Sequence, residues 1–322
     1  MPTSSQVSGA ARELRVVRAT REAEDVLSFA LADPTGADLP AWTPGAHIDV
    51  RLTAELSRQY SLCGDPADRR HWRIAVLLEQ PGRGGSRYLH ERVTTGSLLS
   101  VGAPRNNFPL IEADRYEFIA GGIGITPLLP MIAAVHANGA DWQLHYGGRL
   151  RERMAFLPEL AAYAARVRVH PEAELGLLPL AEILGAAADG AAVYCCGPEP
   201  LLKAVEQVHG GRAAGTLHVE RFHAKEIETN PAADGGFEVV LNSTGAVVPV
   251  LAGQSILAAL TRAGLDVPSS CLEGTCATCE TTVLAGEVDH RDSVLTEDEQ
   301  AAGRTMMLCV SRARSPRLVL DM

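Results

Sequence analysis

Four cysteines in the last quarter of the chain constrain its fold more than any other feature. Cys271, Cys276 and Cys279 lie within nine residues, and Cys309 follows after 29 intervening residues. Cysteine thiolates are distributed in this way when three ligands of a metal centre share one loop and the fourth comes from a distant segment. The spacing therefore predicts a C-terminal domain in which the segment around residue 309 returns to the loop at 271–279.

The spacing favours one metal centre over two alternatives. C-x4-C-x2-C followed by a distant cysteine is the ligand pattern of plant-type [2Fe–2S] clusters. Structural zinc usually takes two close cysteine pairs, and a disulfide framework would leave one of the seven cysteines unpaired. We therefore predict a [2Fe–2S] cluster, which moves single electrons, on Cys271, Cys276, Cys279 and Cys309.

Length and charge exclude several classes of protein. A chain of 322 residues is long enough for two or three domains. The formal charge of −10 argues against non-specific binding to nucleic acid, which needs a basic surface. The first residues, MPTSSQVSGAAREL, lack the apolar core of a signal peptide. We expect a cytoplasmic monomer that does not bind membranes.

The region around the cysteines is acidic. Residues 236–322 contain eleven Asp or Glu and six Lys or Arg, a net charge of −5. An acidic face next to a redox centre would attract a basic patch on a partner protein. An ordinary solvated surface explains the same composition equally well.

The apolar pattern divides the chain into three regions. From 10 to 110, short apolar runs separated by Pro, Gly and Asp predict an antiparallel β-barrel. From 111 to 225, strands alternate with helices, which predicts a doubly wound α/β domain with a parallel sheet. A polar linker is expected at 226–236. The likeness of the cysteine pattern to that of plant-type ferredoxins implies an α+β, β-grasp-like ferredoxin domain at 237–322.

The individual elements follow from the same patterns. Strands are expected at Arg15–Ala19, Ile48–Leu52, Gln59–Leu62, Trp72–Leu78, Tyr116–Ala120, Trp142–Tyr146, Arg166–His170, Ala191–Cys196, Thr216–Glu220, Phe237–Leu241 and Val247–Val250. Helices are expected at Leu128–Ala137, Phe156–Ala165, Pro179–Leu184, Pro198–Val208 and Ser255–Ala263. The last two strands should pair as a hairpin.

Two turns in the α/β region indicate a nucleotide site. The run Phe118–Val135 has no charge over eighteen residues, but its glycines and prolines fit a strand, a turn and a helix better than a membrane span. Gly121, Gly122 and Gly124 would then stand at the carboxyl end of a parallel strand, where nucleotides bind. The Gly197–Pro198 turn ends another strand of the same sheet, and together the two turns predict one crevice.

Two segments of the barrel suit a phosphorylated cofactor. Arg58 could bind a phosphate, and Tyr60 and Ser61 alternate along the same strand. The sequence Gly82–Ser86 can expose several backbone N–H groups to an anion. Taken separately, an amphipathic strand and a flexible hairpin turn explain these segments as well.

Six motifs together resemble those of one protein family. R-Q-Y-S-L, G-R-G-G-S, A-P-R-N-N-F, G-G-I-G-I-T-P, Y-C-C-G-P and the cysteine pattern occur in the order found in phthalate dioxygenase reductases and vanillate O-demethylase reductase subunits. The resemblance covers nearly the whole chain. It implies an FMN-binding barrel, a pyridine-nucleotide domain and a C-terminal [2Fe–2S] domain, within the ferredoxin–NADP reductase superfamily.

The resemblance also implies roles for single residues. The flavin-binding strand would contribute Arg58, Tyr60 and Ser61, and the loop for the FMN phosphate would contribute Gly84, Gly85 and Ser86. The nicotinamide-nucleotide loop would contribute Gly121, Gly122, Gly124 and Thr126. The turn that brings the nicotinamide to the flavin would contribute Cys196, Gly197 and Pro198, with Glu220 and Phe222 nearby. No residue is expected to act as a general acid or base.

The implied function is electron transfer from NADH through FMN and the [2Fe–2S] cluster to a partner. By resemblance, that partner is a Rieske non-haem iron oxygenase acting on an aromatic acid or methyl ether. Two alternatives remain open: a reductase for a cytochrome P450 or another acceptor, and a non-enzymatic redox sensor or electron carrier. NADPH also remains possible, because Arg149 or Arg151 could meet a 2′-phosphate.

Overall fold

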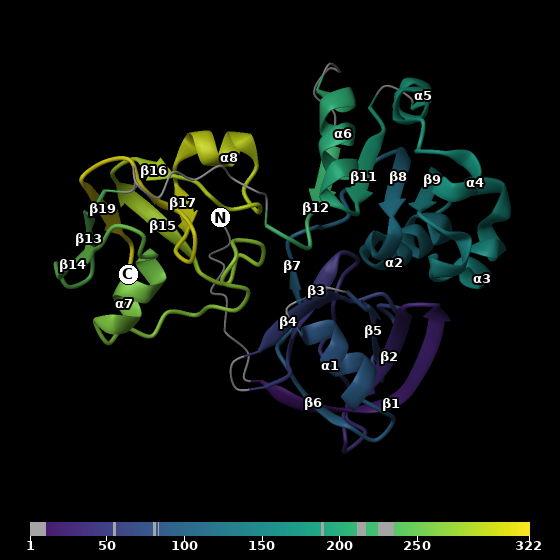
Figure 1. The fold of residues 1–322 in the computed structure, drawn as a ribbon, viewed down its shortest axis with the longest axis horizontal. Helices are drawn as coiled ribbons and strands as arrows, with labels where there is room; N and C mark the ends of the chain where they lie inside the picture. Colours follow the sequence, from purple (N-terminus) through teal and green to yellow (C-terminus); the bar gives the residue numbers. More distant parts are fainter. Residues whose placement is uncertain are drawn as a thin grey trace. The chain divides into compact units, whose positions relative to one another are not determined.

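The structure is a computed structural model that describes residues 11–53, 56–79, 82, 84–187, 190–210, 217–224 and 235–322. The chain divides into two compact units, Met1–Glu220 and Arg221–Met322 (Figure 1). The first unit contains both the barrel and the α/β sheet, which were expected as separate domains. Most of the expected linker, residues 226–234, lies outside the described residues.

An antiparallel barrel forms the first part of unit one. Its elements are β1 (Arg12–Ala23), β2 (Val26–Ala32), β3 (Ala46–Arg51), β4 (Ser57–Ser61), β5 (Trp72–Leu77), α1 (Gly85–Arg92), β6 (Leu98–Val101) and β7 (Arg105–Asn106). The strand order is β4-β3-β6-β1-β2-β5, with β7 paired to β3. The N–H of Cys63 donates to the carbonyl of Arg73 at 2.8 Å and joins the segment after β4 to β5. The predicted barrel is therefore confirmed.

Helix α1 was not predicted. It lies across one end of the barrel in Figure 1, and Leu89 on its inner face is fully buried in the barrel core. The helix is short and mostly polar, so apolar spacing does not reveal it. Its start at Gly85 replaces the hairpin turn that was one interpretation of Gly82–Ser86.

A parallel sheet forms the rest of unit one. Its strands are β8 (Arg115–Gly121), β9 (Asp141–Gly148), β10 (Val167–Pro171), β11 (Ala192–Cys196) and β12 (Leu217–Glu220). Its helices are η1 (Gly122–Gly124), α2 (Ile125–Ala137), η2 (Arg151–Arg153), α3 (Leu157–Leu160), η3 (Ala161–Arg166), α4 (Glu172–Leu175), α5 (Leu180–Ala186) and α6 (Glu199–His209). The order β10-β9-β8-β11-β12 places the reversal of strand order between β8 and β11, as in a doubly wound fold.

Each face of this sheet has its own core. On one face, alternate residues such as Phe118 and Trp142 pack against α2. On the other face, Ile119 and Val193 pack against α5 and α6. The helix expected at Phe156–Ala165 is instead a short α-helix followed by a 3₁₀ segment, with non-helical backbone at Tyr163.

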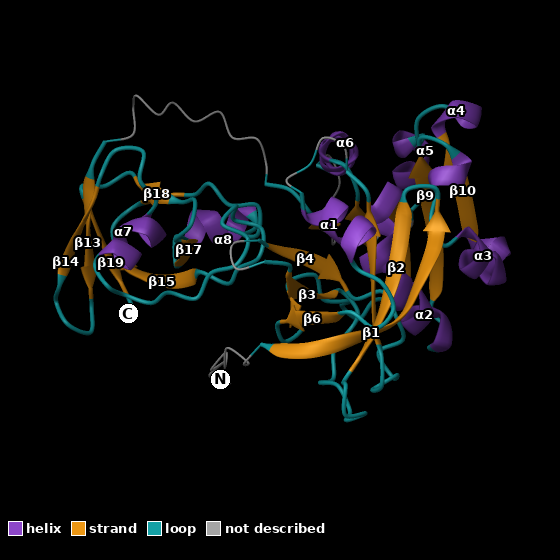
Figure 2. Ribbon diagram, turned by 60° about the horizontal axis from the view of Figure 1, so that its bottom comes forward, coloured by secondary structure: helices purple, strands orange, loops and turns teal. Residues whose placement is uncertain are grey.

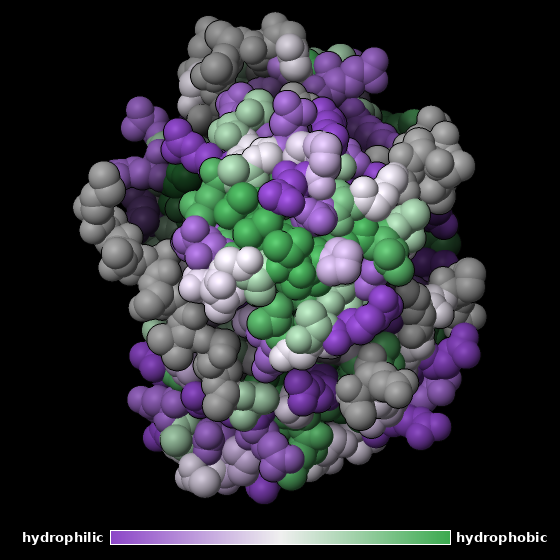
Figure 3. Space-filling view, turned by 90° about the vertical axis from the view of Figure 1, so that its left-hand side faces the viewer, coloured by the Kyte–Doolittle hydropathy of each residue, from purple (hydrophilic) through white to green (hydrophobic). Residues whose placement is uncertain are grey.

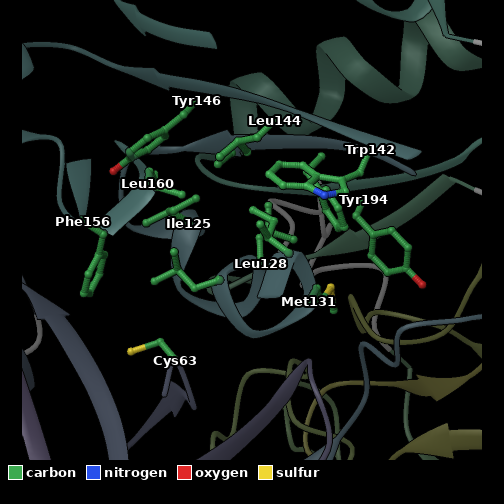
Figure 4. Close-up of a cluster of buried hydrophobic side chains, with 14 of the residues drawn as sticks. Cys63, Ile125, Leu128, Met131, Trp142, Leu144, Tyr146, Phe156, Leu160 and Tyr194 are labelled. Carbon is green, nitrogen blue, oxygen red and sulfur yellow. The ribbon is translucent and has the colours of Figure 1, made fainter. Parts of the chain in front are cut away.

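A shared core joins the barrel to the sheet. Val26, Cys63, Ala75 and Phe108 come from the barrel or its last connection, yet they are buried in the same cluster as the residues around α2. Figure 4 shows Cys63 opposite Phe156 and Ile125 in this cluster. Burial of apolar surface between the two parts explains why they form one compact unit rather than two.

The second unit is a small α+β domain. Its elements are β13 (Phe237–Leu241), β14 (Val247–Val250), α7 (Ile256–Arg262), β15 (Glu280–Ala285), β16 (Val288–Asp289), α8 (Glu297–Ala302), β17 (Thr305–Met307), β18 (Arg312–Ala313) and β19 (Arg317–Leu320). The main sheet has the order β14-β13-β19-β15-β17. The predicted β13–β14 hairpin is antiparallel, and β13 pairs in parallel with β19.

The two faces of this sheet differ. Helix α7 covers one face, where Ile256 and Leu260 are fully buried (Figure 2). On the outer face, exposed Val247 pairs with half-buried Val240, which pairs in turn with Val319. Figure 3 shows apolar side chains gathered near the middle of the molecular surface at this end of the unit, with polar ones around them.

None of the helices in the described part of the chain could span a membrane. The longest of them, α2, has 13 residues, whereas a span needs about 20. The charge-free run Phe118–Val135 forms β8, η1 and α2, as predicted.

Candidate functional site

The four cysteines come together in the second unit. Cys276 and Cys279 are buried, and Cys271 and Cys309 are partly exposed. Their thiols interact as neighbours, Cys271 with Cys276 and with Cys309, and Cys279 with Cys309. The hydrogen bonds from Cys276 and Cys309 lower the pKa of Cys271, which favours its thiolate form.

Four neighbouring cysteines in one domain fit a binuclear iron–sulfur centre. A [2Fe–2S] cluster needs four cysteines, two for each iron. The pairs Cys271–Cys276 and Cys279–Cys309 supply this set.

The loop around the cysteines directs backbone N–H groups at sulfur. The N–H groups of Glu273 and Thr275 donate to Cys271 Sγ at 3.3 and 3.4 Å, and that of Thr278 donates to Cys276 Sγ at 3.4 Å. Leu272 and Ala277 adopt left-handed backbone, at φ 60° and 56°, which turns the chain around the sulfurs. Such donors stabilise negative charge on a cluster, so the loop fits a [2Fe–2S] centre.

In the first unit, the two glycine-containing turns pack directly against each other. A Cβ added at Gly124 would lie 2.2 Å from the Cys196 carbonyl oxygen, and one added at Gly197 would lie 2.9 Å from Gly121 Cα. Both turns stand at the carboxyl ends of β8 and β11, where the strand order reverses. The structure therefore brings the predicted nicotinamide turns to one place.

Helix α2 continues directly from η1, so the first backbone N–H of α2, that of Ile125, already donates to the Gly122 carbonyl. The N–H groups of the preceding glycine turn are the candidates for binding a phosphate, and this role stays a prediction. The side chain of Thr126 is buried, and its hydroxyl donates to the Ile123 carbonyl at 2.9 Å. This hydroxyl proton is therefore not directed at a phosphate. Direct nucleotide contact by Thr126 stays a prediction.

Three polar side chains meet beside these turns. Glu220 on β12 pairs in register with Cys196 on β11, and the Cys196 thiol donates to Glu220 Oε2 at 4.0 Å. The Ser61 hydroxyl at the end of β4 also hydrogen-bonds to Glu220. Burial raises the pKa of Glu220 to about 8, and the Ser61 hydrogen bond lowers it only in part. Burial, and then the charge of Glu220, raise the pKa of Cys196.

The barrel brings together the two segments that were predicted to bind the FMN phosphate. The side chain of Arg58 lies over the start of α1, since a Cβ added at Gly85 would be 2.6 Å from Arg58 Cγ. Gly84 precedes the helix with φ 85°, a conformation that favours glycine. The Ser86 hydroxyl accepts from the N–H of Glu79 at 3.2 Å and fixes the turn. A guanidinium beside a helix N-terminus fits a phosphate monoester such as that of FMN.

Tyr60 and Phe222 were also predicted to lie near the flavin. Tyr60 lies on β4 between Arg58 and Ser61, and burial raises the pKa of its hydroxyl, so the phenol stays neutral. Phe222 belongs to the second unit, and its placement near the flavin stays a prediction. On the strand beside β4, His47 pairs with Ser61 and is buried, a neighbour that the motifs did not indicate.

The arginines considered for NADPH have different environments. Arg151 forms a bidentate ion pair with Glu174, at 3.0 and 2.7 Å, whereas Arg149 is exposed. These residues follow β9 and β10, whose ends are neighbours in the sheet. An acidic partner next to Arg151 competes with a 2′-phosphate, which fits NADH better than NADPH.

Comparison with known proteins identifies the family. Residues 239–314 match the family described as a 2Fe-2S iron-sulfur cluster binding domain. The chain is 46% identical over 311 residues to the phenoxybenzoate dioxygenase subunit beta of Ectopseudomonas oleovorans, which covers 96% of this chain and 97% of that one. The solved structure of phthalate dioxygenase reductase aligns at 38% identity with a TM-score of 0.70, over 97% of this chain and 98% of that one. The chain belongs to the phthalate dioxygenase reductase family.

The same fold occurs within a longer protein. The structure of an intact type IV self-sufficient cytochrome P450 monooxygenase aligns at 47% identity with a TM-score of 0.91, over 97% of this chain. The chain spans only 41% of that structure. As a member of the phthalate dioxygenase reductase family, the chain is an oxidoreductase, a reductase component of an oxygenase system.

Proposed function

We propose that this protein passes electrons from NADH through FMN and a [2Fe–2S] cluster to a Rieske non-haem iron oxygenase. The observation that carries the proposal is the meeting of the two nicotinamide turns with the Ser61–Glu220–Cys196 group, in a chain that also brings four cysteines together. When bound, FMN takes the electron pair from NADH and releases single electrons to the cluster. The chain's own residues position these groups.

The glycine turns allow close approach of the nicotinamide. Because no side chain stands at Gly121, Gly124 or Gly197, backbone from β8 and β11 can touch at this point. The pyrophosphate would bind to the backbone N–H groups of the glycine turn that precedes α2. The nicotinamide ring would then lie beside Cys196, whose thiol is fully buried.

Glu220 keeps the hydride path free of negative charge. With a pKa of about 8, its carboxyl group holds its proton at neutral pH. It accepts from the Cys196 thiol through Oε2 and interacts with Ser61, which ties β12 to the flavin strand β4. We assign this group to positioning and to the exclusion of water, not to proton transfer.

The choice of partner rests on the relatives. Phenoxybenzoate dioxygenase, phthalate 4,5-dioxygenase and vanillate O-demethylase all have components similar to this chain, at 39 to 46% identity. Their names support an oxygenase acting on an aromatic acid or methyl ether. We also propose a cytoplasmic location, which agrees with seven cysteines that form no disulfide in the structure.

A cytochrome P450 is the second candidate for the acceptor, because this fold also occurs within a P450 monooxygenase. Coupled turnover distinguishes the two. Purified protein with NADH should support substrate oxidation by a Rieske oxygenase and not by a bacterial P450 that lacks its reductase. Turnover with the P450 alone would reverse the assignment.

The cofactor assignment is tested by the composition of the purified protein. We expect one FMN, two irons and two sulfides for each chain, with a visible spectrum to match. A colourless, zinc-containing protein would refute the proposal.

Replacing Arg58 by Ala should lower the FMN content, since it removes the cation at the start of α1, and should leave the iron content unchanged. Arg70→Ala, an exposed site on the same barrel, is the control.

A further inference from the structure

We propose that Arg73 is a positioning residue for hydride transfer, which fixes the flavin strand of the barrel to the nucleotide-binding sheet. The inference rests on the proposed function, because it concerns the distance between the hydride donor and its acceptor. Arg73 is the second residue of β5, between the buried residues Trp72 and Ile74. The Arg73 side chain is 24% exposed and has polar partners on both sides of the boundary between barrel and sheet, the Glu159 carboxylate among them being 45% exposed.

Toward the barrel, Arg73 holds the end of the flavin strand. Its Nε donates to the carbonyl of Cys63 at 3.1 Å, and Nη2 donates to the same oxygen. The backbone between the two residues is also paired, since the Cys63 N–H donates to the Arg73 carbonyl at 2.8 Å. Cys63 follows Ser61 by two residues, so Arg73 fixes the segment that presents Ser61 to Glu220.

Toward the sheet, Arg73 forms a bidentate pair with Glu159 on α3. Nη1 donates to Oε2 at 2.9 Å and Nη2 donates to Oε1 at 3.0 Å, the geometry in which arginine binds a carboxylate most strongly. The guanidinium also stands over the ring of Phe156, 5.1 Å from its centroid. One side chain thus joins three groups from two parts of the unit.

The backbone conformation of Phe156 indicates that the surrounding packing holds its ring against Arg73. Phe156 has φ 63° and ψ 16°, a left-handed conformation that a bulky residue rarely adopts. Such a conformation persists only where the surroundings determine it, and here the ring is buried between the sheet core and Arg73. In Figure 4, the ring of Phe156 points toward Cys63, and Ile125 of α2 lies beside them.

These contacts form a continuous connection between the two halves of the predicted redox site. From the flavin strand it runs through Cys63 and Arg73 to Phe156 and Glu159. Cys63 shares a buried cluster with Ile125, the first residue of α2 after the nucleotide turn. A shift at Arg73 would therefore change the position of Ser61 relative to Gly124, and hydride transfer is sensitive to displacements of about 1 Å.

The test compares Arg73→Met and Glu159→Gln with Arg70→Met in the full protein loaded with its cofactors. Arg70 pairs with Asp38 on the barrel surface, where both side chains are more than half exposed. We expect FMN reduction by NADH in stopped flow to slow at least tenfold in Arg73→Met, with a larger isotope effect from NADH deuterated at C4. FMN and iron content, and electron flow to the cluster after photoreduction of the flavin, should stay at the wild-type level. Arg70→Met should match the wild type throughout.

Two results would overturn the inference. One is wild-type hydride transfer in Arg73→Met, and the other is a slowing explained entirely by loss of FMN. If Arg73→Met fails to fold, Arg73→Lys replaces it: this variant keeps the charge, loses the bidentate pair, and should show an intermediate rate, while an unchanged rate would contradict the proposal. Wild-type protein that does not reduce flavin with NADH would instead refute the proposed function itself.

Discussion

At the scale of single residues, Glu220 couples the stability of the fold to pH. Burial raises its pKa from 4.5 to about 8. Between these values the unfolded chain loses the proton that the folded protein keeps, so stability must fall as the pH rises. The slope from this group is at most about 1.4 kcal/mol for each pH unit. The stabilisation is complete below pH 4.5 and is lost as the pH passes 8.

Replacing Glu220 by Gln should remove this slope. We expect the melting temperature of the wild type to fall relative to that of Glu220→Gln between pH 5.5 and pH 8, as measured by thermal unfolding at fixed ionic strength. Glu206→Gln, on the same part of the chain, tests for a general effect of charge. Parallel pH profiles for the wild type and Glu220→Gln would show that Glu220 does not titrate in this range.

Glu174 is expected to influence the choice of nucleotide. Its carboxylate forms a bidentate ion pair with the guanidinium of Arg151, close to the neighbouring ends of β9 and β10. Glu174→Gln should release Arg151 and raise kcat/KM for NADPH roughly twofold to fivefold, the size of one exposed ionic contact. Steady-state kinetics with both nucleotides measure the change. The gain should vanish when Arg151→Gln is added, and a gain that survives would assign it to another residue.

Several residue contacts could not be predicted, because the partners are far apart in the sequence. Ser61 and Glu220 meet only after the barrel packs on the sheet, and Arg73 and Glu159 are separated by 86 positions. The flavin and nucleotide motifs were recognised because each is local, and the cysteine pattern because its spacing is characteristic. Arg73 did carry one signal, because a lone cation between apolar residues of a strand favours an ionic partner close by.

At the scale of elements, the packing of the β8–α2 turn against the β11–α6 turn leaves no room for a side chain at Gly124. Gly124→Ala would place Cβ within 2.2 Å of the Cys196 carbonyl oxygen and push the two turns apart. We expect NADH-dependent reduction of FMN to fall by about 100-fold, with flavin and iron content unchanged. Rapid-mixing spectroscopy measures this rate.

Gly185→Ala is the matched control for Gly124→Ala. Gly185 lies in α5 with no atom within 4 Å of an added Cβ, so alanine should be tolerated or slightly stabilising there. Equal rates in both variants would show that the contact between the turns does not position the nucleotide.

The predictable elements were those whose ends are marked by glycine or proline. Glycine and proline mark the ends of β8 and β11, and the strands of the parallel sheet are nearly continuous apolar runs. Helix α1 and the 3₁₀ segment at Ala161–Arg166 were missed or misjudged, since neither has a clear apolar face. Their positions are set by tertiary packing, which a local pattern does not contain.

At the scale of the whole molecule, the division into two units predicts that the two redox functions separate. Cys309→Ser removes one of four ligands in unit two and leaves unit one unchanged. We expect loss of the cluster's visible absorption and of turnover with the oxygenase, while NADH-dependent reduction of ferricyanide through FMN continues. Cys195→Ala, a buried cysteine outside the ligand set, should keep its iron. Loss of both activities in Cys309→Ser would show that the units depend on each other.

The kinds of architecture in the molecule were predictable from the sequence. Three types of architecture were expected, and each is present. The barrel and the parallel sheet nevertheless form one compact unit, because Cys63, Ala75 and Phe108 are buried in the core of the neighbouring sheet. In the sequence these residues look like any apolar positions of a barrel, so the shared core becomes visible only in three dimensions.

The parallel pairing of β13 with β19 sets an order for biosynthesis. On the ribosome, the barrel and the nucleotide-binding sheet are complete once Glu220 has emerged, and they can fold at that stage. The second unit must wait, because β13 needs a strand that is made about eighty residues later and the fourth cysteine precedes that strand by only a few positions. Delivery of iron and sulfide is therefore a late event, and a nascent chain can hold its flavin before it can hold its metal.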